Sequence, residues 1–206
     1  EDIVSEAKQG VTKMASKRKE KYLKSMEGVK ASTKQIDFKP IKEKILDIRK
    51  GREFKGETLL DSSALSKLEE IENAVNIWSK SKSFHTVEGL DALKKKIDNL
   101  TPEADVFGKQ AAKGASIVEE ARSIVNNRIK EVSPEYAKTM KAYEEAINLE
   151  KEIRKSLSLG NQAAADTSLR KLLSVMRNNV NTNFGLRLEN FKKLEKSGEV
   201  SLTPSV

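Results

Sequence analysis

The two clearest helix starts in this chain lie in residues 101–160, TPEADVFGKQAAKGASIVEEARSIVNNRIKEVSPEYAKTMKAYEEAINLEKEIRKSLSLG. Thr101-Pro102-Glu103 and Ser133-Pro134-Glu135 each place a capping hydroxyl before a proline and an acid, the order typical of a helix N-terminus. Apolar residues three or four apart follow both starts, and Gly160 favours a left-handed helix end. The stretch therefore predicts two long helices, the first of about 30 residues, and the short turn between them predicts antiparallel neighbours.

The same apolar spacing predicts helices on both sides of this stretch. Residues 3–29 form one long amphipathic pattern, interrupted on its apolar face at Arg18. Trp78 and the other aromatic residues fall at core spacing and are expected to be buried. Further helix starts are predicted at Pro40, at Asp61, Ser62 or Ser63, at Thr86, at Asn161 or Asp166, and after the Asn-rich corner at 178–185; ends are predicted at Gly51 and Gly198.

No stretch alternates apolar and polar residues over a useful length, and residues 52–60 are expected to be a connector. The predicted fold is therefore all-α: an elongated bundle of about seven or eight helices, long and antiparallel, with no sheet. Three parts are expected, namely basic N-terminal helices at 1–55, a helical bundle at 56–200 and a linker tail at 201–206. Because residue 1 is not Met, the chain is expected to be a piece of a longer protein.

Composition excludes several classes of site. The 206 residues are 34% charged, contain 10 Gly and 4 Pro, and include no Cys and a single His, His85, so disulfides, thiolate sites and His-rich metal sites are excluded. The longest uncharged stretch, 156–165, is half of the roughly 20 apolar residues that a membrane-spanning helix needs. No signal peptide is expected, because the first two residues, Glu1 and Asp2, are acidic.

Positive charge gathers at both ends of the sequence. Residues 1–55 hold 16 Lys/Arg and 9 Asp/Glu, residues 56–150 hold 13 and 17, and residues 151–206 hold 10 and 5, within a total net charge of +8. Helix-borne lysines can neutralise phosphates without reading bases, although few aromatic residues lie nearby to stack on bases. The alternatives are a solvated face and contact with an acidic protein surface. The candidate basic binding face comprises Lys13, Lys17, Arg18, Lys19, Lys21 and Lys24.

Three other motifs do not indicate a catalytic or ligand-binding site. Residues 51–58 have the glycine spacing of a phosphate-binding loop, but Glu57 replaces its lysine, so a helix end and linker is the better interpretation. His85 lacks a second His or Cys and is expected to be a surface residue or a local hydrogen-bonder. The acid pairs Glu69/Glu72, Glu119/Glu120 and Glu144/Glu145 are expected to be solvated or paired with lysine. We therefore predict no catalytic residue, metal, cofactor or small-molecule substrate.

Two segments resemble helical regions of very large bacteriophage and prophage virion-associated proteins. They are residues 166–187, DTSLRKLLSVMRNNVNTNFGLR, and residues 57–96, which contain Val75-Asn76-Ile77-Trp78 and Glu88-Gly89-Leu90-Asp91. The resemblance covers mainly residues 57–187 and implies a structural, internal or ejected virion component. It carries over no functional residue.

Two functions follow as hypotheses. The first is a non-enzymatic structural or protein-interaction segment of a larger phage or prophage protein, located in the virion or the bacterial cytoplasm, which binds a protein partner or a second copy through helix faces. The alternative is a sequence-independent nucleic-acid-binding module that uses the basic N-terminal helix. An enzyme is the weakest possibility.

Overall fold

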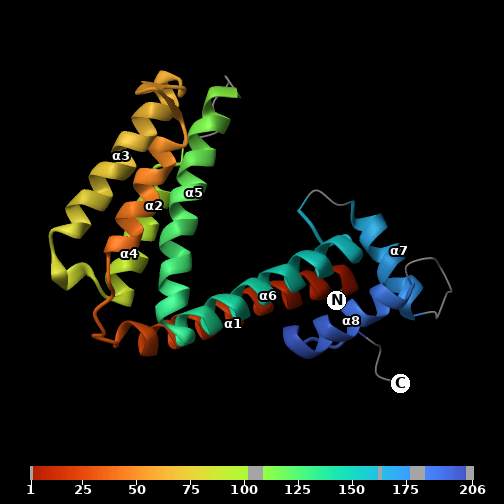
Figure 1. Cartoon of the computed structure of the whole chain (residues 1–206). Coiled ribbons are helices and arrows are strands. Elements are labelled where there is room, and N and C mark those ends of the chain that lie inside the picture. The colour runs from red at the N-terminus through yellow and green to blue at the C-terminus, as the bar shows by residue number, and fades with distance from the viewer. Residues whose placement is uncertain (1, 102–108, 162–163, 177–183, 203–206) are drawn as a thin grey trace. The chain divides into compact units, whose positions relative to one another are not determined.

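The chain is mainly helical, as the sequence predicts. The computed structural model describes residues 2–101, 109–161, 164–176 and 184–202, and 79% of these described residues are helical (Figure 1). The elements are α1 (Ile3–Lys30), α2 (Lys39–Lys50), β1 (Glu53–Phe54), β2 (Glu57–Thr58), α3 (Ser62–Ser79), the 3-10 helix η1 (Lys82–Phe84), α4 (Val87–Asp98), α5 (Lys109–Val132), α6 (Pro134–Ser156), α7 (Ala165–Met176) and α8 (Phe184–Gly198).

Side-chain caps fix three of the predicted helix starts. The Asp61 carboxylate accepts a hydrogen bond from the Ala64 N–H at 2.8 Å, and the Thr86 hydroxyl accepts one from the Gly89 N–H at 3.1 Å. The Ser133 hydroxyl accepts one from the Tyr136 N–H at 3.2 Å, and α6 begins at Pro134. Each cap satisfies an N–H group that has no partner within its helix, so these three predictions are confirmed.

The expectation of no sheet is wrong at residues 53–58. β1 and β2 pair antiparallel, with Glu53 opposite Thr58 and Phe54 opposite Glu57. Lys55 and Gly56 connect them with φ of 50° and 87°, the two positive angles that a tight hairpin turn requires. The segment predicted to be a connector is therefore a hairpin, and two-residue strands are too short to show an alternating pattern.

Two further predictions need correction. Gly160 does not cap α6 in a left-handed conformation; the helix ends at Ser156, and Ser158 takes the positive φ, 54°. Not all aromatic residues are buried, because Phe54 on the hairpin is 63% exposed and Phe84 is 39% exposed. Most of the predicted start at Thr101-Pro102-Glu103 and of the corner at 178–185 lies outside the described residues.

The chain divides into two compact units. One, Met26–Lys138, contains α2 to α5, and the other contains Glu1–Ser25 and Thr139–Val206, so α1 and α6 contribute to both. Residues on both sides of the predicted boundary at 55/56 lie in the first unit, where α2 packs on α3 and α5. A single antiparallel bundle is not confirmed, because α5 and most of α6 belong to different units.

In the Met26–Lys138 unit, α5 packs against α2, α3 and α4 (Figure 1). Each helix turns its apolar stripe inward, as residues three or four apart must on a helix. The fully buried side chains of the four helices include Ile41, Ile48, Leu68, Ile71, Leu90, Leu93, Ile97, Ile117 and Ile129.

In the other unit, the core joins α1, α6, α7 and α8 and includes Leu202, from the predicted linker tail. A Cβ atom on Gly198 of α8 would lie 2.8 Å from the Gly10 Cα and carbonyl oxygen of α1. Because only glycine permits such a backbone approach, these two positions set how closely α1 and α8 pack. The core consists of Val4, Ala7, Val11, Met14, Ile153, Leu157, Leu159, Leu172, Val175, Phe191, Leu194 and Leu202.

Candidate functional site

Five of the six residues of the predicted basic face are exposed on α1, and they fall into three groups. Lys13, Lys21 and Lys24 are exposed and none forms an ion pair with a described residue. Lys17 is exposed beside them but its ammonium lies 2.5 Å from the Glu199 carboxylate. Lys19 is also exposed, but at 3.6 residues per turn it points away from Lys17 and Lys21. The exposed face is therefore Lys13, Lys21 and Lys24, with Lys17 partly neutralised.

Arg18 is not part of that face. It follows the apolar stripe inward, where its Nε lies 3.4 Å from the Glu150 Oε2 and its guanidinium lies 5.3 Å from the centre of the Tyr143 ring. Burial raises the pKa of Glu150, and the charges of Arg18 and Arg154 offset this only in part. The break in the apolar pattern at Arg18 is thus a buried ion pair between α1 and α6.

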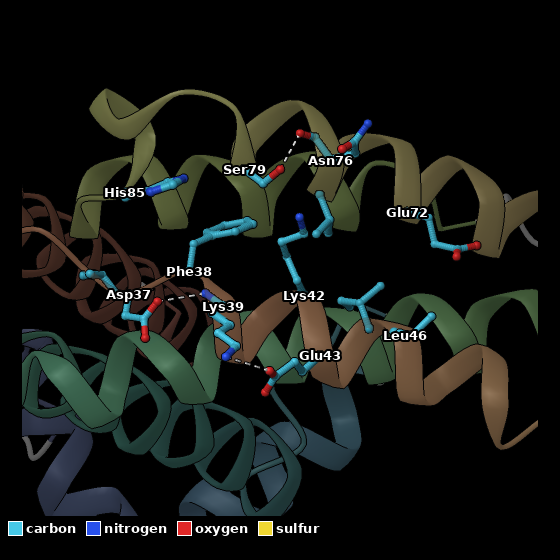
Figure 2. A pocket seen from close by; sticks show the side chains of 13 residues that line it. Asp37, Phe38, Lys39, Lys42, Glu43, Leu46, Glu72, Asn76, Ser79 and His85 are labelled. Carbon is cyan, nitrogen blue, oxygen red and sulfur yellow. Dashed lines mark hydrogen bonds and ion pairs between the residues drawn. The ribbon is translucent and has the colours of Figure 1, made fainter.

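A cavity of about 710 Å³ lies in the Met26–Lys138 unit, between α2 and α3. We call it the α2–α3 groove. Figure 2 shows Phe38 and His85 at one end and Leu46 and Glu72 at the other. Buried Ile45 and Val75 also line it, whereas Leu46 is 45% exposed. The groove therefore presents apolar surface to solvent along both helices.

An aromatic pair closes one end of the groove. The Phe38 and His85 rings stack with centroids 4.7 Å apart and an angle of 7° between their planes. His85 Nε2 lies 2.9 Å from the Trp78 carbonyl oxygen, and the His85 carbonyl accepts a hydrogen bond from the Ile36 N–H at 2.7 Å. His85 is therefore a local hydrogen-bonder that joins three segments, as the sequence predicts.

Most charges around the groove are already paired. Arg49 donates to both carboxylate oxygens of Glu72, at 2.5 and 3.1 Å, and Lys39 lies 3.7 Å from Glu43. The hydrogen bond to Glu72 raises the pKa of Arg49 despite partial burial. Lys42 is exposed and forms no ion pair with a described residue (Figure 2). An approaching partner therefore meets one unneutralised cation on the α2 wall.

Sequence reasoning missed a buried polar network in the same unit. The Lys94 ammonium donates to the Tyr136 hydroxyl at 2.7 Å and lies 3.2 Å from the Asp91 carboxylate, and Lys95 lies 3.1 Å from the other oxygen of Asp91. The Tyr136 hydroxyl also lies 3.3 Å from both Asp91 Oδ1 and Asn126 Oδ1. A signal existed, because Lys94 falls four residues after Leu90, on the apolar face of α4.

Burial and ion pairing act in opposition within this network. Burial alone would raise the pKa of Asp91, but Lys94 and Lys95 together outweigh it, and the pKa lies below its usual range. Burial lowers the pKa of Lys94, which Asp91 offsets only in part. The network lies away from the groove residues and joins α4, α5 and the first turn of α6.

The acid pairs form salt bridges mainly with arginine. Glu72 pairs with Arg49, Glu120 with Arg52 at 2.5 Å, and Glu119 lies 3.9 Å from Arg122. Only Glu145 pairs with a lysine, Lys141, at 4.0 Å. Over the described parts of the chain, no three His, Cys, Asp or Glu side chains gather as metal ligands would.

No family model, curated protein or solved structure matches this chain. Among the helices that the structure describes, none combines the length and the apolar character needed to cross a membrane.

Proposed function

We propose that this chain is a non-enzymatic protein-interaction segment of a larger phage or prophage protein. In this proposal the α2–α3 groove receives an amphipathic helix of a partner protein. The resemblance of residues 57–96 and 166–187 supports the phage or prophage origin, and the groove supports the interaction. A protein of this origin would act in the virion or in the bacterial cytoplasm.

The exposed apolar surface at Leu46 carries the proposal. Leu46 is 45% exposed beside the buried Ile45 and Val75, within a hollow of about 710 Å³. The lining residues span Phe38 to Leu46 on α2 and Glu72 to Ser79 on α3, which is about two turns, or about 12 Å, of each helix. A partner helix can lay its apolar face along such a groove over two to three turns.

The charges around the groove favour an acidic residue on the partner helix. Of the charged residues that line the groove, Glu72 and Glu43 are paired with Arg49 and Lys39, whereas Lys42 and Asp37 have no described ion-pair partner. Lys42 lies one turn before Leu46 on α2, so the acid of the partner helix is placed beside Lys42. A glutamate beside the partner's apolar face would therefore gain an ion pair, and a lysine in its place would be repelled. We therefore commit to a partner helix with leucine-like residues three or four apart and a flanking acid.

A matched pair of variants tests the groove. The probe is a fluorescein-labelled helical peptide of about 14 residues with this pattern, and its binding is measured by anisotropy. Leu46→Glu should weaken binding by about tenfold or more, because it places a charge in the apolar groove. Ile77→Glu is the control: Ile77 has the same 45% exposure and lies on α3, but it does not line the groove.

Three outcomes would overturn this proposal. The first is that the wild-type protein does not bind the peptide, and the second is that both variants weaken binding equally. The third is that sedimentation shows a wild-type dimer that Leu46→Glu dissociates, because the occupant would then be a second copy of the chain. A peptide with lysine in place of its glutamate should bind more weakly to the wild type, and the difference should shrink at high salt.

A second candidate function rests on the exposed lysines of α1. Lys13, Lys21 and Lys24 form no ion pair with a described residue, so this face could neutralise phosphates of a duplex without reading its sequence. Replacing Lys13, Lys17, Lys21 and Lys24 by Gln should then weaken binding to all duplexes alike and flatten its salt dependence. A control replaces the exposed Lys44, Lys50, Lys55 and Lys80. An unchanged salt slope in the α1 variant would contradict this function.

We also propose that this chain is elongated, with long antiparallel helices. A compact protein of 206 residues has a radius of gyration of about 17 Å. Small-angle X-ray scattering should give a clearly larger value, and a value near that figure would contradict the proposal.

A further inference from the structure

A second pocket lies in the unit formed by Glu1–Ser25 and Thr139–Val206, where three helices bring cations together. Lys155 of α6, Lys171 of α7 and Arg187 of α8 line a cavity of about 360 Å³, together with Ser156, Leu186 and one acid, Glu152. Three cationic side chains from three helices therefore line a volume whose lining includes one acidic residue. The volume lies within the range of small-ligand sites.

These cations are not neutralised by the rest of the described chain. None of the three forms an ion pair with a described carboxylate, although Glu152 lies three residues before Lys155 on the same helix. The sequences of residues 162–163 and 177–183, which the structure does not describe, contain no Asp or Glu. Elsewhere in the described chain, most half-buried arginines do have such a partner, as Arg49 and Arg52 do.

Local contacts hold Lys171 at the pocket. Its ammonium donates to the Ser158 hydroxyl at 2.5 Å, and the Ser158 carbonyl accepts a hydrogen bond from the Ser168 hydroxyl, so α7 is tied to the turn after α6. An ammonium has three donors, and this contact uses one. Lys171 therefore keeps two free donors, and Arg187 of α8 and Lys155 of α6 line the same pocket.

We propose that this pocket is a phosphate-binding site, which we call the α6–α8 site. A multiply charged phosphate oxyanion matches several convergent cations, and the arginine fork bonds two of its oxygens at once. The volume exceeds that of a single phosphate and accommodates a diphosphate. The ligand is either a phosphorylated small molecule or the backbone of a single-stranded nucleic acid, which share this chemistry.

The α6–α8 site is independent of the other two proposals. It contains no residue of the α2–α3 groove and none of the lysines on the exposed face of α1. Pyrophosphate binding therefore tests it separately, because the groove offers that anion only the single unpaired cation Lys42.

Calorimetric titration of the full chain with inorganic pyrophosphate at low salt tests the site. Wild type should bind, and Arg187→Gln and Lys171→Gln should each weaken binding by about tenfold. Lys192→Gln, an exposed lysine of α8 outside the pocket, removes the same charge and should change binding by less than about twofold. Arg187→Gln keeps the test valid if Lys171→Gln unfolds α7, because Arg187 lies on α8 and takes no part in the described hydrogen bonds of that turn.

The absence of pyrophosphate binding by wild type would overturn the proposal, as would an equal loss in Lys192→Gln. Binding that persists in Arg187→Gln and Lys171→Gln but disappears when Lys13, Lys21 and Lys24 become Gln would also overturn it, since the anion would then occupy α1. Competition with single-stranded oligothymidine identifies the source of the phosphate. Displacement of pyrophosphate from the wild type, together with weaker direct binding of oligothymidine to Arg187→Gln, supports a nucleic-acid backbone. Pyrophosphate binding that oligothymidine does not displace supports a phosphorylated small molecule.

Discussion

Lys94 and Arg18 are two cations placed among apolar residues, and the two units accommodate them differently. In the Met26–Lys138 unit, Lys94 and Asp91 are each bonded to Tyr136, and Lys95 covers the remaining oxygen of Asp91. In the other unit, Arg18 Nε and Glu150 Oε2 lie close together, yet neither forms a hydrogen bond with a described residue. The first arrangement is a satisfied network, whereas the second retains much of the cost of desolvation.

This difference indicates where substitutions will cause most damage. In a satisfied network, removing one member leaves its partners buried without compensation. In the Arg18–Glu150 pair the attraction offsets only part of the cost of burial, so removing both residues should cost little. Trp78, the single tryptophan, lies in the Met26–Lys138 unit, and its fluorescence reports the unfolding of that unit.

The largest effect is expected for Lys94→Met. It leaves the carboxylate of Asp91, which is 1% exposed, with the surface lysine Lys95 as its remaining cation, and should lower the free energy of unfolding by about 3–5 kcal/mol. Urea unfolding followed by Trp78 fluorescence measures it. Lys95→Met is the control, because Lys95 pairs with the same carboxylate from the surface and should cost at most about 1 kcal/mol. Equal losses would show that burial does not distinguish the two lysines.

A smaller loss is expected for Tyr136→Phe. The change keeps the buried ring and removes the hydroxyl that bonds Lys94, which should cost about 1–3 kcal/mol in the same urea experiment. Wild type is the reference, because the other tyrosines, Tyr22 and Tyr143, lie in the unit that Trp78 does not report. If Tyr136→Phe unfolds at the same urea concentration as the wild type, the hydroxyl of Tyr136 contributes nothing to the network.

Removing the buried pair of the other unit should have little effect. The double variant Arg18→Met/Glu150→Leu should leave the free energy of unfolding unchanged or raise it by up to about 2 kcal/mol. Hydrogen exchange of the α6 amides around Ile153 measures the stability of this unit. If these amides exchange about ten times faster or more in the double variant than in the wild type, the unit has lost about 1.4 kcal/mol of stability. That result would show that the Arg18–Glu150 pair stabilises the unit.

The smallest effect expected is a difference in the response to acid. The pKa of Asp91 lies below its ordinary 3.8, so its contribution to stability is present above pH 3.8 and is lost as the pH falls through the folded-state pKa. The pKa of Glu150 lies above its ordinary 4.5, so its contribution is present below pH 4.5 and is lost as the pH rises through the folded-state pKa.

Two variants isolate these contributions. The penalty of Asp91→Asn should shrink as the pH falls below 3.8, whereas any stability that Glu150→Gln gains at neutral pH should disappear as the pH falls below 4.5. Urea unfolding at a series of pH values measures the first, and hydrogen exchange in α6, corrected for the intrinsic rate, measures the second. The effects of Asp91→Asn and Glu150→Gln on the free energy of unfolding should change with pH in opposite directions. If they change in the same direction, the proposed difference between the two units is wrong.

Local signals in the sequence were sufficient for most of the helices. Asp61, Thr86 and Ser133 are followed by apolar residues at helical spacing, and each caps the helix that was predicted after it. These features depend on a few neighbouring residues, so they can be recognised without knowing the rest of the fold. The hairpin had a weaker signal, the Lys55-Gly56 pair, because only glycine adopts its positive φ readily.

The packing between helices had no such local signal. Periodicity shows that Val4, Val11 and Met14 share a buried face, but it does not show that α6, α7 and α8 cover it. The α2–α3 groove likewise depends on the distance between two helices, which residues on neither helix determine alone. Lys94 was missed because a cation on an apolar face can be either buried or extended to solvent, and Tyr136, 42 residues later, determines which.

The most direct test of the central claim, that the α2–α3 groove binds a partner helix, is an NMR titration of the full chain with the amphipathic peptide. Shifts of the backbone amides locate the bound peptide without relying on any substitution. The account predicts that the large shifts fall in residues 36–46 and 72–85, the segments that line the groove. Large shifts confined to α1, α6, α7 and α8, with the groove residues unchanged, would contradict it.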